Sequence, residues 1–268
     1  MIKDKLSAFV ADKSADIGIC AIYDGLDTVG INDDRQYPMA SVYKFPQALY
    51  LTEYVRENKM TFNDTCKVHA SDMHTDTWSP MRDRYGEDGT TLTIGELLSY
   101  SLQQSDNNAC DVLFRISGGP LKVDSMLNRM GYTDIRVIST EDEMHNDPGL
   151  SRRNYSTPLA MACLMDDFNT NLREGSAESQ YIARLSENCG TGLNRLAKPL
   201  VRIDDIVFGH KTGTGDVDDE GRITAVNDAG YVNLPDGHRY SVVVFIADSK
   251  YDMPTTEAII SDISEIVL

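Results

Sequence analysis

The sequence predicts an α+β fold, in which an antiparallel sheet of five strands carries helices from both chain ends and a helical lobe lies between the first and last strands. Strand-like apolar runs occur near both ends of the chain, helical periodicity dominates the middle, and no strand–helix–strand unit repeats. We therefore expect residues 1–37 and 197–268 to form a sheet lobe and residues 38–196 to form a helical lobe, as one structural unit.

The two chain ends supply the predicted strands. Apolar residues at helical spacing between Ile2 and Asp12 predict a first helix, and the run Ile17–Tyr23 predicts a strand that turns at Asp24-Gly25 into a hairpin. Toward the other end, the turn residues Pro235-Asp236-Gly237 separate two strand patterns. We expect the last strands and the last helix at Asp205–Thr212, Thr224–Leu234, Tyr240–Ala247 and Thr255–Val267.

Between these strands, apolar residues recur mainly at helical spacing. No internal repeat, low-complexity tract or flexible linker divides this part of the chain. The stretch Cys189–Leu196 is typical of helix termination and packing, with a glycine as the C-cap. We expect helices at Leu92–Leu102, Asn107–Ile116, Leu121–Met130, Pro158–Leu172 and Tyr181–Asn188.

Composition excludes several kinds of partner. The chain has 268 residues, 41% of them apolar, and a formal net charge of −17. Nucleic acids and anionic membranes are disfavoured, because neutralising phosphates requires clustered Lys and Arg, which this chain lacks. No run approaches the roughly 18 apolar residues that a membrane span needs. A small anionic substrate stays possible, because salt screens charges more than about 10 Å apart and local lysines then dominate a cleft.

Cysteine and histidine spacing indicates neither a metal nor another cofactor. The cysteines are odd in number and form no CxxC pair, so we expect most of them to be small buried apolar residues. The histidines form no HxH cluster, which disfavours a zinc enzyme. The acidic run Asp216–Glu220 suggests calcium but lacks the rest of a calcium-binding loop, so a solvated turn is the favoured interpretation. The residues concerned are Cys20, Cys66, Cys110, Cys163, Cys189, His69, His74, His145, His210 and His238.

The first chemical motif is Ser41-Val42-Tyr43-Lys44. Residues three apart share a helix face, so the Lys44 amine is expected within hydrogen-bond reach of the Ser41 hydroxyl. That pairing would prepare a nucleophile and a proton acceptor together. A chain of this length contains on the order of one S-x-x-K by chance, so the tetrapeptide alone does not separate this reading from a solvated lysine.

Two further motifs, in order along the chain, strengthen the case. Ser105-Asp106-Asn107 lies between two predicted helices, and Lys211-Thr212-Gly213 ends an apolar strand. The structural alternatives are an N-cap at Ser105-Asp106 and a turn at Gly213, and either is compatible with a catalytic role. The set S-x-x-K, S-D-N, K-T-G resembles class A serine β-lactamases and penicillin-binding proteins, and the resemblance runs over nearly the whole chain.

The resemblance implies a site in the cleft between the two lobes and a role for each motif. Ser41 would be the nucleophile, and the backbone N–H groups of Ser41 and Thr214 would form the oxyanion hole. Ser105, backed by Lys211, would protonate the departing lactam nitrogen. The substrate carboxylate would lie against Lys211, Thr212, Gly213 and Thr214, while Asn107 would bind the acylamino side chain and steady Lys44.

A β-lactamase also needs a base that delivers water to the acyl-enzyme. The run Thr140-Glu141-Asp142-Glu143-Met144-His145 lies where the family has the Ω loop that carries its catalytic glutamate. Glu141 is our choice, and Glu143 is the competitor. Either Lys44 or Glu141 is expected to take the proton during acylation.

The E-x-x-M-H run resembles the class A branch that includes extended-spectrum cephalosporinases. Most class A enzymes have Asn where His145 stands, so His145 is either the second partner of the hydrolytic water or an ordinary loop histidine. Trp78 resembles the aromatic wall at the mouth of the cleft, although a single Trp also fits a core position.

Three departures qualify the resemblance. Pro46 is tolerated only in a first helical turn, so the helix must begin very near Ser41. Ala40 and Gly215 stand where some carbapenem-hydrolysing relatives have a cysteine pair, which gives no support to carbapenemase activity. The arginine that many relatives use near the substrate carboxylate has no clear counterpart, and Arg222 is the candidate.

The rival hypotheses are a penicillin-binding DD-peptidase and a non-hydrolytic β-lactam sensor domain. Both would acylate at Ser41, and neither would release the ester quickly, so Glu141 separates them from a β-lactamase. The partner expected from the resemblance is a small β-lactam, with no nucleic acid and no membrane. The enzyme is expected to be a monomer in the periplasm or outside the cell, with a signal peptide that is not part of this sequence.

Overall fold

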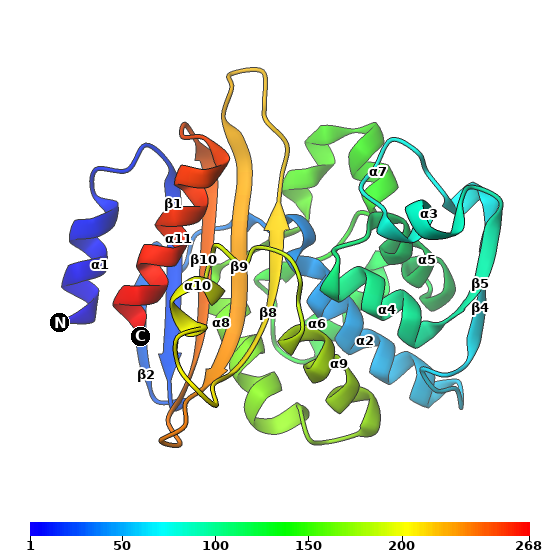
Figure 1. Ribbon diagram of the computed structural model, residues 1–268, viewed down its shortest axis with the longest axis horizontal. Coiled ribbons are helices and arrows are strands. Elements are labelled where there is room, and N and C mark those ends of the chain that lie inside the picture. Colours follow the sequence, from blue (N-terminus) through cyan, green and yellow to red (C-terminus); the bar gives the residue numbers. More distant parts are fainter.

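The computed structural model describes residues 1–268 and contains the predicted sheet of five antiparallel strands, in the order β2-β1-β10-β9-β8. The hairpin from the N-terminal segment thus pairs with the last strand of the chain, so both chain ends build one sheet (Figure 1). The strands are β1 (Asp16–Tyr23), β2 (Asp27–Ile31), β8 (Val207–Thr214), β9 (Ile223–Asn233) and β10 (Arg239–Ser249).

The two terminal helices cover one face of this sheet. Helix α1 (Ile2–Val10) and helix α11 (Met253–Val267) lie side by side on that face, with the short α10 (Ala197–Leu200) next to α11 (Figure 1). Their apolar residues, such as Leu6 and Ile260, form a core of 17 buried residues with the strand residues that face them. The prediction of a sheet flanked by terminal helices is confirmed.

The other face of the sheet packs against the helical part of the chain. Helix α8 lies against β1 and β10, and a continuous core of 45 buried residues joins sheet residues such as Phe245 to Phe45 and Phe114 in the helices. The lobe boundaries at residues 37 and 197 remain a prediction. The helices are α2 (Lys44–Glu57), α3 (Pro80–Tyr85), α4 (Ile94–Gln103), α5 (Asn107–Ser117), α6 (Pro120–Arg129), α7 (Glu141–Asn146), α8 (Pro158–Asp167) and α9 (Ala177–Glu187).

Several predicted helices have different bounds, and three of the differences have identifiable local reasons. The helix expected at Tyr181–Asn188 spans Ala177–Glu187, because Ser176 is its N-cap and accepts the Ser179 N–H at 3.0 Å. The helix expected from Leu92 begins only at Ile94, because Thr93 is its N-cap and forms a capping box with Glu96. The helix expected at Pro158–Leu172 is α-helical only to Asp167 and continues as a π-helix over Phe168–Leu172.

Sequence periodicity did not indicate the short strands. A two-stranded sheet pairs β4 (Thr65–His69) with β5 (Gly89–Thr93), and a three-stranded sheet has the order β3-β7-β6. Polar residues dominate both strands of the first sheet, and the strands of the second are two residues long, so neither leaves a clear apolar alternation. The second sheet comprises β3 (Tyr37–Pro38), β6 (Ile135–Arg136) and β7 (Tyr155–Ser156).

All five cysteines are free, and Cys20, Cys110 and Cys189 are buried. None of the helices is both long enough and apolar enough to cross a membrane.

Candidate active site

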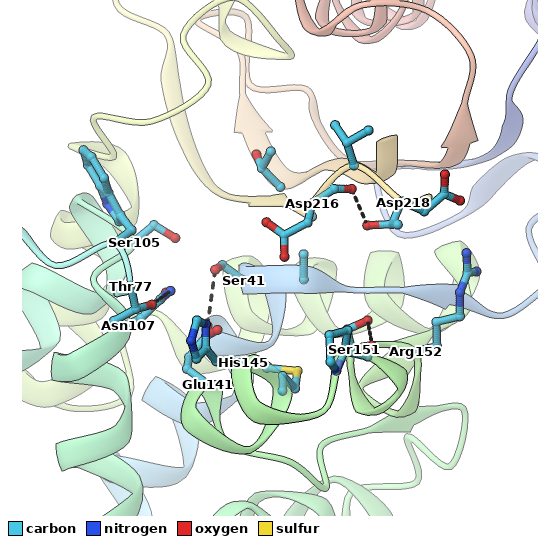
Figure 2. A pocket seen from close by; sticks show the side chains of 18 of the residues that line it. Ser41, Thr77, Ser105, Asn107, Glu141, His145, Ser151, Arg152, Asp216 and Asp218 are labelled. Carbon is cyan, nitrogen blue, oxygen red and sulfur yellow. Dashed lines mark hydrogen bonds between the residues drawn. The ribbon is translucent and has the colours of Figure 1, made fainter. Parts of the chain in front are cut away.

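A cleft of about 840 Å³ lies between the end of β8, the loops before α3 and α5, and the segment that contains α7. Figure 2 shows Ser41 in this cleft, facing Glu141, with Ser105 and Asn107 on one side and Asp216 above it. Two predicted site residues, Lys44 and Lys211, are fully buried beneath its surface. The lining includes Ser41, Trp78, Ser105, Asn107, Glu141, His145, Thr212 and Thr214.

Ser41 lies in a 3₁₀ turn (Ala40–Tyr43) that leads directly into α2, whose first residue is Lys44. Pro46 is therefore in the first turn of α2, as its missing N–H requires, and the prediction that the helix begins near Ser41 is confirmed. Ala40 has a φ of 44°, a left-handed conformation that aims the chain into this turn. The turn presents the Ser41 hydroxyl to the cleft at the start of a buried helix.

The Lys44 ammonium is bound on three sides. Its Nζ lies 2.9 Å from Oε1 of Glu141, and it donates to Oδ1 of Asn107 at 2.6 Å and to the Ser105 carbonyl at 2.9 Å. Burial alone would lower the pKa of Lys44, but the neighbouring Glu141 carboxylate outweighs it and raises the pKa above its usual value. An ammonium has three protons and no lone pair, so these three acceptors leave Lys44 no capacity to act as a base in this state. No hydrogen bond joins Lys44 to Ser41.

Ser105-Asp106-Asn107 forms the N-terminus of α5. Asp106 is the N-cap and accepts the Ala109 N–H at 2.8 Å, so the structural interpretation of this motif is also correct. Ser105 has a φ of 57°, and this turn directs its hydroxyl to Lys211, whose Nζ donates to it at 2.9 Å. The Oδ1 of Asn107 accepts a hydrogen bond from Lys44, and its Nδ2 donates one to Oγ1 of Thr77.

Lys211 lies on β8 and donates to the Thr212 carbonyl at 2.8 Å as well as to Ser105. Burial lowers the pKa of Lys211 to about 7, and the charge of Lys44 adds to this effect. An amine with a pKa near 7 both gives and takes a proton easily at neutral pH, which is the property required of a group that supplies protons through Ser105.

Gly213 permits a close approach between β8 and the turn that holds the nucleophile. A Cβ at this position would lie 2.3 Å from the Met39 carbonyl oxygen and 3.1 Å from the Ser41 nitrogen. Only glycine fits such a contact. The contact holds β8 against the turn that carries Ser41, and the pairing of the Ser41 and Thr214 N–H groups as an oxyanion hole remains a prediction.

Glu141 is the first residue of α7, and its Oε1 lies 3.5 Å from Oγ of Ser41. The competitor Glu143 has a different task, because it closes a capping box by accepting the Thr140 N–H at 2.9 Å. Glu143 does not line the cleft. The geometry therefore favours Glu141 as the carboxylate that faces the nucleophile.

Asp111, on α5, holds the start of α7 and was not identified from the sequence. Its two carboxylate oxygens accept the N–H groups of Glu141 at 2.9 Å and Asp142 at 2.8 Å. Burial and the nearby Glu141 charge raise the pKa of Asp111 to about 7. A single acidic residue inside a helix pattern carries no signal that it caps another element.

His145 lines the cleft but is paired with Asp76, at 2.7 Å between Nε2 and Oδ2. A second pair, His74 with Asp142 at 3.5 Å, crosses the same gap between α7 and the loop before α3. His145 therefore takes part in one of two contacts that join α7 to the loop before α3 at the rim of the cleft. Its role toward a hydrolytic water remains a prediction.

Trp78 lies at the mouth of the cleft with 60% of its surface exposed, so it is not a core residue. Its Nε1 donates to the Gln104 carbonyl at 2.8 Å, which fixes the ring beside the Ser105 turn.

Two arginines lie near the end of β8. Arg222, the candidate from the sequence, lines the cleft, and its role toward the substrate carboxylate remains a prediction, while Arg195 is buried behind the strand and pairs with Glu257 at 3.1 Å. Arg222 pairs with Asp218 at 2.8 Å and Glu220 at 3.1 Å, in a turn at the cleft rim. Arg195 is 4% exposed and donates to Oγ1 of Thr214 at 2.7 Å and to the Gly213 carbonyl at 3.0 Å. Its cation lies directly behind the end of β8.

The stretch that contains Arg195 was interpreted only as helix termination with a glycine C-cap. The C-cap of α9 is Asn188, and the Gly190 N–H instead bonds the Gln103 carbonyl at 2.9 Å, so the C-cap prediction was wrong. In this stretch Arg195 follows Gly190 and Gly192, but that local pattern did not separate a packing role for the arginine from a role in the site.

Comparisons with known proteins agree with this geometry. The model of the β-lactamase enzyme family matches residues 1–268. The chain is similar to β-lactamase VEB-1 of Pseudomonas aeruginosa, with 35% identity over 98% of this chain and 87% of that protein.

Two solved structures are also similar. One is the TLA-3 extended-spectrum β-lactamase, with a TM-score of 0.95 and 30% identity over 99% of this chain and 96% of that one. The other is a class A β-lactamase from Bacteroides cellulosilyticus, with a TM-score of 0.93 and 31% identity over 99% of this chain and 95% of that one. The motifs, the arrangement of the cleft and these likenesses together establish that the chain belongs to the β-lactamase enzyme family, as a class A serine enzyme that hydrolyses the β-lactam ring.

Proposed function

We propose that this enzyme opens penicillins and cephalosporins, including extended-spectrum cephalosporins, through an ester on Ser41 and releases the product with water activated by Glu141. The observation that carries the proposal is the position of Glu141 Oε1, 3.5 Å from Ser41 Oγ and 2.9 Å from Lys44 Nζ. The extended-spectrum class of substrate is supported by the TLA-3 relative, whose name states it.

In acylation, Ser41 Oγ attacks the lactam carbonyl carbon and loses its proton. We assign that proton to Glu141, because the three protons of Lys44 already have three acceptors and the carboxylate is the free acceptor near Ser41. The oxyanion that forms is stabilised by the N–H groups of Ser41 and Thr214.

The carbon–nitrogen bond of the lactam then breaks, and its nitrogen needs a proton. Ser105 donates one and is reprotonated by Lys211, whose Nζ lies 2.9 Å from the Ser105 hydroxyl and whose pKa is near 7. The substrate carboxylate lies against Lys211, Thr212 and Thr214, where the buried Arg195 adds positive charge from behind.

Before deacylation, the proton that Glu141 took from Ser41 passes to Lys211, which gave one up through Ser105, so that Glu141 is again a proton acceptor. In deacylation, water attacks the Ser41 ester while Glu141 takes its proton, and that proton passes from Glu141 to Ser41 Oγ as the ester bond breaks. Lys44 Nζ, 2.9 Å from Glu141 Oε1, holds the carboxylate in place. Asn107 orients Lys44 through Oδ1 and turns its amide nitrogen toward Thr77, next to the expected acylamino group of the substrate.

Steady-state hydrolysis of a penicillin, a cephalosporin and a carbapenem tests the proposal. We expect many turnovers on the first two and slow turnover of the carbapenem. A stable, stoichiometric acyl adduct on the penicillin and the cephalosporin would instead indicate a penicillin-binding DD-peptidase or a sensor domain and would contradict the proposal.

We also propose that the enzyme works as a monomer in the periplasm or outside the cell, as its resemblance to class A β-lactamases implies. Light scattering of the purified protein and fractionation of the cells that produce it test these two points. A stable dimer or an activity confined to the cytoplasm would contradict them.

A further inference from the structure

A buried row of polar side chains lies behind the carboxylate-binding end of β8. Asp228 on β9 bonds His210 at 2.8 Å between Oδ1 and Nδ1, and the His210 ring lies next to the Cys189 thiol. All three are less than 7% exposed. The catalytic steps above use none of them.

The row continues to the cleft through two hydroxyl groups. Cys189 Sγ lies 3.4 Å from Thr191 Oγ1, which lies 2.5 Å from Thr212 Oγ1. The other acceptors near the thiol, the carbonyls of Leu102 at 3.7 Å and Thr191 at 3.9 Å, are more distant. Thr191 and Thr212 both line the cleft. Gly192 makes this contact possible, because a Cβ there would lie 2.5 Å from the Thr212 methyl group.

The direction of this hydrogen-bond chain matters for recognition of a carboxylate. A carboxylate can only accept hydrogen bonds, so the Thr212 hydroxyl must donate its one hydrogen bond to the substrate. It can then only accept a hydrogen bond from the Thr191 hydroxyl. Thr191 then has only lone pairs for Cys189, which fits a thiol that donates its S–H. A thiolate at Cys189 would reverse the chain and leave Thr212 with lone pairs toward the cleft.

We propose that Cys189 is a positioning residue for recognition of the substrate carboxylate, because it sets the direction of the hydrogen-bond chain that runs through Thr191 to Thr212. The inference rests on the proposed function, in which Thr212 contacts that carboxylate. His210 lets Cys189 take either form without gain or loss of a proton overall. A proton on His210 Nε2 moves to sulfur when Thr212 must donate, and returns when the substrate has left.

The charges around Cys189 support this exchange. Burial raises the pKa of the thiol, but the neighbouring His210 and Lys211 outweigh burial and lower it to about 6. Burial lowers the pKa of His210, but Asp228 and Cys189 outweigh it and raise it to about 10. The lowered pKa of the thiol and the raised pKa of the imidazole both favour transfer of the thiol proton to His210 in the free enzyme, and the charge of a bound carboxylate favours its return to sulfur.

The test compares kcat/KM for benzylpenicillin with kcat/KM for its methyl ester, which lacks the carboxylate, in wild type and in variants of Cys189. Cys189→Ala removes the group that orients the Thr191 hydroxyl toward Thr212, and we expect kcat/KM for the acid to fall about tenfold, mainly through KM, because the hydrogen bond from Thr212 to the charged carboxylate is weakened. The ester should be unaffected. Cys189→Ser can still donate to Thr191 and should restore the acid to within about threefold of wild type. Cys66→Ser, in β4, is the matched cysteine control.

Thr191→Val interrupts the same hydrogen-bond chain at its middle residue. Because it changes a different residue, the test does not depend on whether the Cys189 variants fold. We expect it to lower kcat/KM for the acid as much as Cys189→Ala does, with no further loss in the double variant. The ultraviolet absorbance of the thiolate should also decrease when wild type, but not Cys189→Ser, binds a slowly hydrolysed carboxylate-bearing β-lactam.

Equal losses on acid and ester, or no rescue by Ser, would overturn the role of Cys189 while leaving the proposed function intact. If wild type itself does not prefer the acid to the ester, the carboxylate contact of the proposed function is wrong, and the inference falls with it.

Discussion

The two sides of the cleft hold their catalytic groups in different ways. One side, which we call the strand side because it includes Lys211 on β8, consists of Ser41, Lys44, Ser105 and Lys211. Its two lysines are fully buried and bonded to main-chain carbonyls. On the loop side, formed by residues 139–154, Glu141 depends on a few side-chain contacts. The groups expected to form the ester belong to the core, and the group expected to hydrolyse it belongs to a loop.

The contacts that hold the loop side are of two kinds. Two are shielded from solvent: the half-buried Asp111 binds the start of α7, and the buried Asn154 bonds the N–H groups of Ile138 and Ser139 across the neck of the loop. Two are exposed, the contact of His145 with Asp76 and the ion pair of Arg152 with Asp248. Since exposed pairs contribute about 0–1 kcal/mol each, the shielded contacts should decide where Glu141 lies. Damage to the loop side should therefore slow deacylation and leave acylation largely intact.

The largest expected effect belongs to the strand side. Ser41→Ala removes the nucleophile, and kcat/KM for a cephalosporin should fall by about 10⁴ or more, with no adduct in the intact mass. Chromogenic hydrolysis and mass spectrometry measure both. Appreciable turnover by this variant would mean that another group attacks the lactam.

Asp111→Ala should have the next largest effect, now on the loop side. Two N–H groups at the start of α7 lose their acceptor, and a displacement of about 1 Å at Glu141 can cost about 100-fold in rate. We expect kcat to fall by about that factor while acyl-enzyme accumulates. Asp111→Asn keeps one acceptor and should lose less. Equal losses in acylation and deacylation would contradict the separation of the two sides.

The same carboxyl group predicts a dependence of stability on pH. Because the folded state raises the pKa of Asp111 from 3.8 to about 7, the folded protein holds this proton more tightly than the unfolded chain. Its contribution to the free energy of unfolding is full below about pH 4 and is lost as pH rises toward 7. Urea titrations of wild type and Asp111→Asn should differ by an amount that changes across this window. A constant difference would mean that Asp111 has an ordinary pKa.

Arg195→Ala should raise KM about tenfold with a smaller change in kcat, because it removes a buried cation and a hydrogen bond to Thr214 without touching the nucleophile. Arg222→Ala is the comparison: both arginines have acidic partners, Glu257 for Arg195 and Asp218 and Glu220 for Arg222, but only Arg195 donates to Thr214. If Arg222→Ala has the larger effect on KM, the assignment of the carboxylate site to the Arg195 side is wrong.

The smallest effect should come from the exposed rim. Asp76→Asn removes the charge that faces His145, and we expect kcat to change by less than about threefold, with the difference fading at high salt. Stopped-flow or steady-state rates at two ionic strengths are sufficient. A loss as large as that of Asp111→Ala would mean that the rim pairs, and not the shielded contacts, position Glu141.

The features that could be predicted from the sequence lie mainly on the strand side of the cleft and in the main sheet. The five strands of the main sheet and the three motifs were predictable, because each is a local pattern that a strand, a turn or a helix start imposes on consecutive residues. Glu141 was placed by its resemblance to the family, and its competitor Glu143 was separated from it only by the capping box at Thr140. The short strands left no periodicity to detect.

The residues that were missed act at long range. Asp111 binds a segment 30 residues further along the chain, and Arg195 binds Thr214 from the stretch that follows the end of α9. Neither contact leaves a pattern in neighbouring residues, since both depend on how separate elements pack. Arg222, the candidate from the sequence, lines the cleft and is also paired locally with Asp218, and its role toward the carboxylate remains a prediction.

The central claim is that the ester is formed by the strand side and hydrolysed by Glu141. Intact-mass spectra of wild type and Glu141→Gln, taken over time after mixing with a cephalosporin, with the adduct mapped by peptide analysis, test it most directly. We predict a long-lived adduct on Ser41 in Glu141→Gln and only a transient one in wild type. Release of the adduct at the wild-type rate by Glu141→Gln, or an adduct on any other residue, would contradict the account.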